Sequence, residues 1–194
     1  MKLPHPQDNQ VSLATALRSK RSARTNTDAP LTLADVAQLL WAAQGITDVN
    51  GYRTVPSAGA LYPLEVFLIA GNVSDLPAGI YRYDPAVHAL RRQGEGDKRQ
   101  ELRRAALDQL FVQDAAAIIL IAAVYARTTA KYGTRGLRYV HMEAGHAAQN
   151  VALQAAALQL GTVAVGAFAD EVVKEVVQLH AYEEPLYLLP IGKT

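Results

Sequence analysis

Three short segments hold the residue types from which a binding site could be built. The first, Arg18–Arg24, places four cations and two hydroxyls within seven residues. A phosphate monoester is a dianion whose oxygens accept charge-assisted hydrogen bonds, and arginine offers them a planar fork of donors. Such a cluster is on its own more often a surface patch than a site, so its meaning depends on what the fold brings beside it.

The other two segments are rich in small residues. Pro56–Pro63 reads Pro-Ser-Ala-Gly-Ala-Leu-Tyr-Pro and precedes a predicted strand, so its backbone could approach a ligand closely. Gly161–Phe168 is predicted to run from a helix C-cap glycine into a strand without bulky side chains before Phe168, against which a flat ring could lie. The alternative for Pro56–Pro63 is an ordinary loop that leads into a strand, and the alternative for Gly161–Phe168 is an ordinary core strand.

Three familiar motifs are incomplete in this sequence. Gly161–Gly166 has the glycine spacing of a phosphate-binding P-loop, but Ala167-Phe168 stands where Lys and Ser or Thr are needed. Gly94-Glu95-Gly96 lacks the third glycine of a dinucleotide-binding fingerprint. Glu143 and His146 have the spacing of two metal ligands on a helix, but no second pair exists. We therefore predict no metal site and interpret His146 as a mostly buried, hydrogen-bonded side chain.

The composition is that of a folded protein with one core. Of 194 residues, 50% are hydrophobic and 19% charged, which excludes intrinsic disorder; one domain is expected over residues 10–194, after an N-terminal extension of residues 1–9. The absence of cysteine excludes disulfides, thiolate zinc sites and iron–sulfur clusters. A net charge of +1 gives no reason to expect nucleic acid as a partner. Without a secretory signal or a spanning segment, the expected location is cytoplasmic, with no membrane partner.

The elements that must position these segments follow from capping and periodicity. Thr32 and Asp35 form a capping box, and Gly45 stops the helix that they start. Continuous apolar runs predict strands covered on both faces, so the expected class is α+β, with a central sheet surrounded by helices. The other expected helices are Val11–Lys20, Lys98–Gln109, Arg138–Leu160 and Glu171–Gln178, and the expected strands are Glu65–Ala70, Ile80–Tyr83, Ala89–Arg92, Ala117–Val124, Val163–Phe168 and Leu186–Ile191.

The helix expected from about Arg138 to Leu160 is apolar almost all round. A helix without a charged face must be surrounded, and its many alanines let a neighbouring backbone come close. In so short a chain, we expect this helix equally to lie in a dimer interface or wholly inside the core of one chain.

Six segments occur in order from about residue 18 to 192. They are Lys20-Arg21-Ser22-x-Arg24, Leu39–Gly45, Arg53–Pro63, Lys131-Tyr132-Gly133-x-Arg135-Gly136, Glu143-Ala144-Gly145-His146-x-x-Gln149-Asn150 and Gly161–Phe168. Each segment is weak alone, but together the six resemble the nitroreductase superfamily of FMN-dependent oxidoreductases. The closest resemblance is to its SagB-like branch, which includes the azoline dehydrogenases of peptide-natural-product pathways.

The resemblance implies a nitroreductase-like fold with a mainly antiparallel central sheet and an interlocked homodimer with one FMN at each of two interfacial sites. One cation, for which Arg24 is the candidate, would stand near the N1/O2 edge of the flavin. Relatives carry Asn and Gln where this chain has Ala60 and Tyr62. Many relatives also carry a pair of basic residues after the last strand, and Lys193 is the candidate to replace that pair here. By position, Lys20, Arg21, Ser22 and Arg24 would hold the phosphate and ribityl chain, Val165, Gly166 and Ala167 would line one ring face, and Pro56, Ser57, Ala58 and Gly59 of the second copy would approach the same flavin.

The resemblance also implies a redox function. The flavin would exchange hydride with a small-molecule or peptide-azoline substrate, and NADH or NADPH would be the donor of a nitro- or quinone-reducing enzyme. Lys131-Tyr132 coincides with the Lys-Tyr pair that azoline dehydrogenases use to abstract a proton; a structural pair in a tyrosine-rich turn is an equally open interpretation. Two other functions stay open, a flavin-binding or scaffold protein without turnover and an anion- or nucleic-acid-binding protein that uses Arg18–Arg24.

Overall fold

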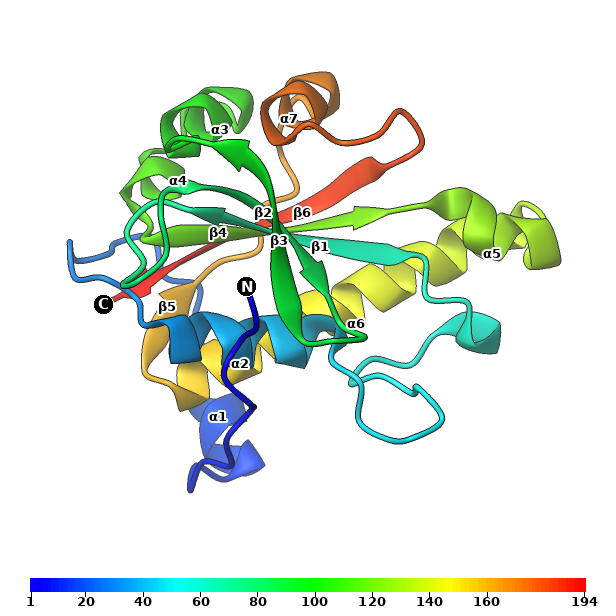
Figure 1. The fold of residues 1–194 in the computed structure, drawn as a ribbon, viewed down its shortest axis with the longest axis horizontal. Coiled ribbons are helices and arrows are strands. Elements are labelled where there is room, and N and C mark those ends of the chain that lie inside the picture. Colours follow the sequence, from blue (N-terminus) through cyan, green and yellow to red (C-terminus); the bar gives the residue numbers. More distant parts are fainter.

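The computed structural model describes residues 1–194, which fold around one six-stranded sheet (Figure 1). Its strands are β1 (Leu64–Ala70), β2 (Gly79–Asp84), β3 (Ala89–Glu95), β4 (Ala117–Ala123), β5 (Leu160–Thr162) and β6 (Glu184–Lys193). The strand order is β3-β2-β1-β4-β6-β5, and every neighbouring pair is antiparallel. The predicted α+β class with a mainly antiparallel sheet is therefore confirmed.

Helices cover both faces of this sheet (Figure 1). They are α1 (Leu13–Ser19), α2 (Leu33–Gln44), α3 (Arg99–Ala105), α4 (Leu110–Asp114), α5 (Tyr125–Tyr132), α6 (Arg135–Ala157) and α7 (Asp170–Val177), with a short 3-10 turn, η1 (Ala58–Ala60). The larger apolar core, of 31 buried residues, lies on the side of α2 and α6, and a core of 15 lies on the side of α3, α4 and α7. The helix α5 extends past the end of the sheet (Figure 1). No helix combines the length and the apolar composition that crossing a membrane requires.

Local signals set the boundaries of α2. The Thr32 hydroxyl accepts a hydrogen bond from the Asp35 amide at 3.1 Å, and the Asp35 carboxylate accepts one from the Thr32 amide at 2.9 Å. Gly45 ends the helix and donates its amide hydrogen to the Trp41 carbonyl at 2.7 Å. The predicted capping box and stop signal are both confirmed.

The predicted strand Val163–Phe168 is wrong. After β5 ends, only Val165 pairs with β6, exchanging two backbone hydrogen bonds of 2.9 Å with Leu188. In the same register Val163 would face Pro190, which has no amide hydrogen, so the ladder is interrupted there. The interruption leaves Ala164, Gly166 and Ala167 exposed.

Other boundaries also differ from expectation. Gln159, and not Gly161, takes the left-handed conformation behind α6, with a φ of 59°. The predicted helix Lys98–Gln109 ends early, as α3 at Ala105, because Leu107 and Asp108 both have positive φ, and a second short helix, α4, begins at Leu110. The helix α6 is shifted about three residues toward the N-terminus, and α5 is an additional helix in front of it.

The first residues lie along the edge strand β3. The ammonium group of Met1 donates to the Leu90 carbonyl at 2.8 Å, and the Leu3 amide donates to the His88 carbonyl at 3.0 Å. Leu3 is buried in the larger core, so this segment adds to the packing of the sheet.

Candidate functional site

The basic segment is held against β5 by its backbone. Ser22 forms a bridge with Thr162, and the Ala23 amide donates to the Thr162 carbonyl at 3.0 Å. Gly161 permits this approach, because a Cβ at its position would lie 2.7 Å from the Cβ of Ala23 and 2.4 Å from Thr194. The chain between α1 and α2 can therefore follow the edge of the sheet.

The cations of this segment are not neutralised within the chain. Lys20 and Arg21 line a groove of about 450 Å³ together with β5, Thr194 and the C-terminal part of α6. Arg21 donates to two backbone carbonyls, and none of Lys20, Arg21 and Arg24 forms an ion pair. Lys193 lies at the end of β6, paired with β5. The groove thus offers uncompensated positive charge to an anion such as a phosphate.

The segment Val165–Ala167 comes after β5 in the chain and lies, like β5, beside the strand β6. Val165 is buried, but a Cβ at Gly166 would meet only Tyr187, at 3.7 Å, so the backbone there is open to a ligand. The guanidinium carbon of Arg24 lies 6.0 Å from the ring centre of Phe111 in α4, which packs against the same small core as Val165. Phosphate-binding and ring-binding candidates therefore lie on neighbouring parts of the structure.

The second small-residue segment forms a strained turn near α5. The Ser57 hydroxyl oxygen accepts a hydrogen bond from the Tyr62 amide at 2.9 Å, closing the turn around η1. Gly59, Ala60 and Tyr62 have φ values of 65°, 53° and 45°. Non-glycine residues hold such values only where the surrounding structure fixes them. The turn is therefore a preformed feature.

Lys131 and Tyr132 of α5 lie against this turn. A Cβ at Gly59 would lie 2.8 Å from the Tyr132 hydroxyl oxygen and 3.0 Å from the Lys131 Nζ. Tyr132 packs edge-on against Tyr139 of α6, with ring centroids 5.3 Å apart, and the Lys131 side chain is exposed. The structure thus brings together the Lys-Tyr pair and the Pro56–Gly59 loop, which are distant in the sequence.

A buried carboxyl lies beneath the turn. Glu143 of α6 is 3% exposed and lines a pocket of about 290 Å³ with Pro56–Ala58. Burial raises the pKa of Glu143 to about 7, while the Ser57 hydroxyl, the Arg53 guanidinium and the Gln44 amide act in the opposite direction. Glu143 Oε1 and Gln44 Nε2 are both buried without a hydrogen-bond partner.

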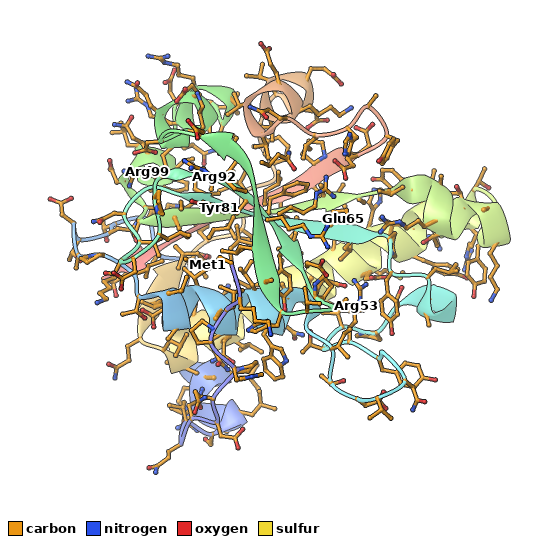
Figure 2. The ribbon with its side chains drawn as sticks, viewed as in Figure 1. Met1, Arg53, Glu65, Tyr81, Arg92 and Arg99 are labelled. Atoms are coloured by element: carbon orange, nitrogen blue, oxygen red, sulfur yellow. The ribbon has the colours of Figure 1, made fainter.

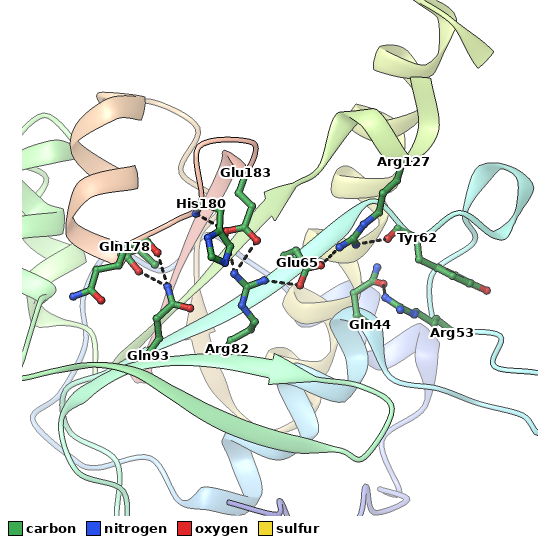
Figure 3. Close-up of polar contacts among 11 residues, drawn as sticks. Gln44, Arg53, Tyr62, Glu65, Arg82, Gln93, Arg127, Gln178, His180 and Glu183 are labelled. Atoms are coloured by element: carbon green, nitrogen blue, oxygen red, sulfur yellow. Dashed lines mark hydrogen bonds and ion pairs between the residues drawn. The ribbon is translucent and has the colours of Figure 1, made fainter. Parts of the chain in front are cut away.

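A line of polar contacts holds both ends of the turn (Figure 3). Arg53 donates to Gln44 Oε1 at 2.7 Å, and its guanidinium carbon lies 4.3 Å from the ring centre of Tyr62. Arg127 of α5 donates to the Tyr62 carbonyl at 3.0 Å and pairs with Glu65 of β1. Arg53 and Glu65 both lie toward the end of the sheet from which α5 extends (Figure 2).

The sequence interpretation missed Glu143 as a site residue. The signal was present, because Glu143 is the sole charged residue between Tyr139 and Leu160 in a helix otherwise apolar or neutral. The interpretation of His146 as buried is wrong in the single chain, since His146 is exposed and lines the same pocket from outside the core. No group of three or more potential metal ligands occurs.

The two parts of the site occupy different positions along α6. Ala152 and Ala156 line the basic groove, whereas Tyr139, Glu143 and His146 line the pocket under the turn. At 1.5 Å per residue, α6 rises about 9 Å between His146 and Ala152 and about 20 Å between Glu143 and Ala156. One chain therefore presents the groove and the pocket as separate surfaces.

Comparison with known proteins defines the chain as an oxidoreductase of the nitroreductase superfamily. The chain belongs to the nitroreductase family, whose model matches residues 17–193. It is 45% identical over 193 residues to a protein of Methanocaldococcus jannaschii that is provisionally assigned as a nitroreductase, covering 100% of this chain and 96% of that protein.

Solved structures share the fold. One from Ralstonia eutropha, provisionally assigned as a nitroreductase, has a TM-score of 0.87 and 29% identity over 100% of this chain and 88% of that chain. One from Anabaena variabilis, assigned in the same way, has a TM-score of 0.83 and 32% identity over 93% of this chain, which spans only 38% of that longer one. A chain of the Escherichia coli microcin synthetase McbBCD complex with truncated pro-MccB17 has a TM-score of 0.78 and 25% identity, over 100% of this chain and 78% of that one.

Proposed function

We propose that this protein is an FMN-dependent oxidoreductase that works as a homodimer and exchanges hydride with a small-molecule or peptide-azoline substrate. The observation that carries the proposal is the placement of a basic groove and a preformed small-residue turn at two separate positions along α6. In a dimer, a ligand with a phosphate at one end and a flat ring at the other could engage the groove of one copy and the turn of the other.

The residues present fit FMN. Lys20, Arg21 and Ser22 would hold the phosphate and ribityl chain, with Lys193 beside them, because none of these cations forms an ion pair. The open backbone at Val165–Ala167 would take one face of the ring. Arg24 would place positive charge near the N1/O2 edge, where negative charge collects on reduction. When bound, FMN supplies hydride transfer at ring nitrogen N5, with NADH or NADPH as electron donor.

Two copies would complete each site. A two-fold axis that sets the two α6 helices antiparallel would bring the Pro56–Gly59 turn of one copy to the basic groove of the other. Apolar side chains support this arrangement: Leu137 and Met142 of α6 are 43% and 52% exposed, and α1, which packs on α6, exposes Leu13 and Leu17. An isologous dimer would bury some of these side chains.

Lys131 and Tyr132 would act on the substrate at this junction, because they contact the turn that approaches the flavin of the other copy. In azoline dehydrogenation, Lys131 would take the proton from the ring carbon as the hydride leaves to the flavin, and Tyr132 would orient the substrate. The likeness to a chain of the microcin synthetase complex supports a peptide substrate. The relative in Methanocaldococcus jannaschii supports reduction of nitro compounds.

The visible spectrum of the purified protein, its mass in solution and an anaerobic titration with NADH and NADPH test the proposal together. We expect a yellow dimer whose flavin absorbance bleaches on addition of one of the two donors. A colourless monomer that does not take up added FMN would contradict the proposal. A yellow dimer that leaves every acceptor unreduced would instead be a flavin-binding protein without turnover.

A variant pair makes the dimer requirement specific. Met142→Glu places a charge at an exposed apolar position of α6, and we expect a monomer that has lost its flavin. Val49→Glu introduces the same charge at a fully exposed position in the loop after α2. This control should remain dimeric and yellow, and flavin retention by a monomeric Met142→Glu protein would show that one chain suffices.

A further inference from the structure

The turn Pro56–Tyr62 rests on a buried carboxyl that the proposed reaction does not use. Glu143 projects from α6 under the turn, and its Oε1 has no hydrogen-bond partner. Burying a carboxyl in this way is costly, since an ionised group loses its hydration. An apolar residue would pack at this position of α6 without that cost, so the carboxyl calls for a role.

The geometry of Ser57 indicates a role for the Glu143 carboxyl. Its hydroxyl oxygen already accepts the hydrogen bond from the Tyr62 amide that closes the turn. A hydroxyl has one proton to donate and two lone pairs, so the Ser57 proton is free to point toward an acceptor below. Glu143 is the carboxyl that faces this hydroxyl.

The position of the turn matters to α5 as well. Gly59, two residues after Ser57, contacts both Lys131 and Tyr132 at their polar tips. A shift of the turn would therefore move the surface against which this pair is held. Glu143 and Ser57 line the same pocket, and Gly59, two residues further on, lies against Tyr132, so these residues lead from the interior of the protein to the reaction side.

We propose that Glu143 is a positioning residue whose carboxyl accepts a hydrogen bond from Ser57 and so fixes the Pro56–Tyr62 turn against Lys131 and Tyr132. The proposal deepens the proposed function and rests on it where turnover is concerned. The ionised carboxylate is the stronger acceptor, so the turn is held more firmly once Glu143 has lost its proton. The other titratable groups facing this space are Arg53, Lys131 and Tyr132, and Tyr139 and His146 of α6.

The experiment combines amide hydrogen exchange with steady-state kinetics on the full-length protein. Glu143→Leu removes the acceptor, and Glu143→Gln retains a carbonyl oxygen that Ser57 can use. Glu183→Gln is the matched control, because Glu183 is equally buried but pairs with Arg82 in another part of the structure. The exchange measurement follows the Tyr62 amide, which donates to Ser57.

In Glu143→Leu we expect faster exchange at Tyr62 and a kcat lowered about tenfold, as for a displaced catalytic group, with the KM of the nicotinamide donor within about twofold. Glu143→Gln should restore the slow exchange at Tyr62 and the wild-type kcat. The pH profile of kcat should show an inflection near pH 7 in the wild type and in His146→Gln, and this inflection should be absent in Glu143→Gln. Unchanged exchange at Tyr62 in Glu143→Leu, or the same kinetic loss in Glu183→Gln, would overturn the proposal. A wild-type protein without flavin would contradict the proposed function alone, since the exchange measurement still decides the role of Glu143.

Discussion

Gly59 lies directly under the hydroxyl of Tyr132, so closely that a single added carbon at Gly59 would come within 2.8 Å of the phenolic oxygen. The two residues belong to segments that are separated in chain order by four of the six strands, β1 to β4. Their contact is the point at which the candidate flavin-contact loop meets the candidate proton-abstracting pair.

Substitution of Gly59 tests this contact. Gly59→Ala forces alanine into a left-handed conformation, at a cost of about 1 kcal/mol, and also drives its methyl group into Tyr132 and Lys131. We expect the turn to shift and kcat to fall about tenfold or more. Gly51→Ala is the control, since Gly51 also has positive φ but nothing within 4 Å of an added Cβ. It should lose similar stability without losing activity, and equal kinetic effects of the two variants would contradict the contact's role.

Lys131→Ala separates the two candidate reactions. Removal of a general base lowers the rate of azoline dehydrogenation by about 10² to 10⁴, whereas reduction of a quinone by NAD(P)H does not need this proton abstraction and should stay within about twofold. Initial rates with the two substrates check the expectation. Arg135→Ala removes a neighbouring exposed cation and should leave both rates unchanged. Equal loss of both reactions in Lys131→Ala would rule out the base assignment.

The pKa of Glu143 makes stability depend on pH. Burial raises this pKa to about 7 from an unfolded value of 4.5, so between these two values the folded state binds more protons than the unfolded state. The free energy of unfolding therefore falls as pH rises through this range, by about 3 kcal/mol at most, at about 1.4 kcal/mol per pKa unit. Glu143→Gln should remove this component, and urea unfolding at pH 5 and pH 8 measures it. Parallel pH profiles for the variant and wild type would show that Glu143 is not the group responsible.

Gly166→Glu tests the ring-binding face. Nothing in the chain obstructs a side chain at Gly166, so the fold should survive with an unchanged melting temperature. The new carboxylate would occupy the surface assigned to the flavin ring, and we expect most of the flavin to be lost on purification. The ratio of flavin to protein absorbance gives the result. Ala181→Glu, at another exposed position, should retain flavin, and full retention in Gly166→Glu would count against the assigned ring contact.

Much of the fold was predictable because its signals are local. The capping box of Thr32 and Asp35 and the apolar runs of β1 and β4 act within a few residues, and the structure confirms them. The strand expected after β5 failed for a reason outside that segment. It is interrupted by Pro190, a residue of the partner strand that lacks the required amide hydrogen.

The site was predictable only as separate pieces. Residue types indicated a phosphate-binding cluster, a small-residue turn and a Lys-Tyr pair, each from its own few residues. Nothing in the spacing of Gly59, Lys131 and Glu143 indicates that they meet, and Glu143 was overlooked because burial, which alone gives it an unusual pKa, is a property of the packed protein.

The amino-acid sequence by itself therefore determined the α+β class, most helix starts and the chemistry available to the protein, since these depend on neighbours along the chain. The tertiary structure decided which of those groups share a surface, which charge is taken out of water, and that the basic groove and the turn occupy different positions along α6. These outcomes depend on contacts between residues far apart in the chain, and such contacts exist only once the sheet and α6 have packed together.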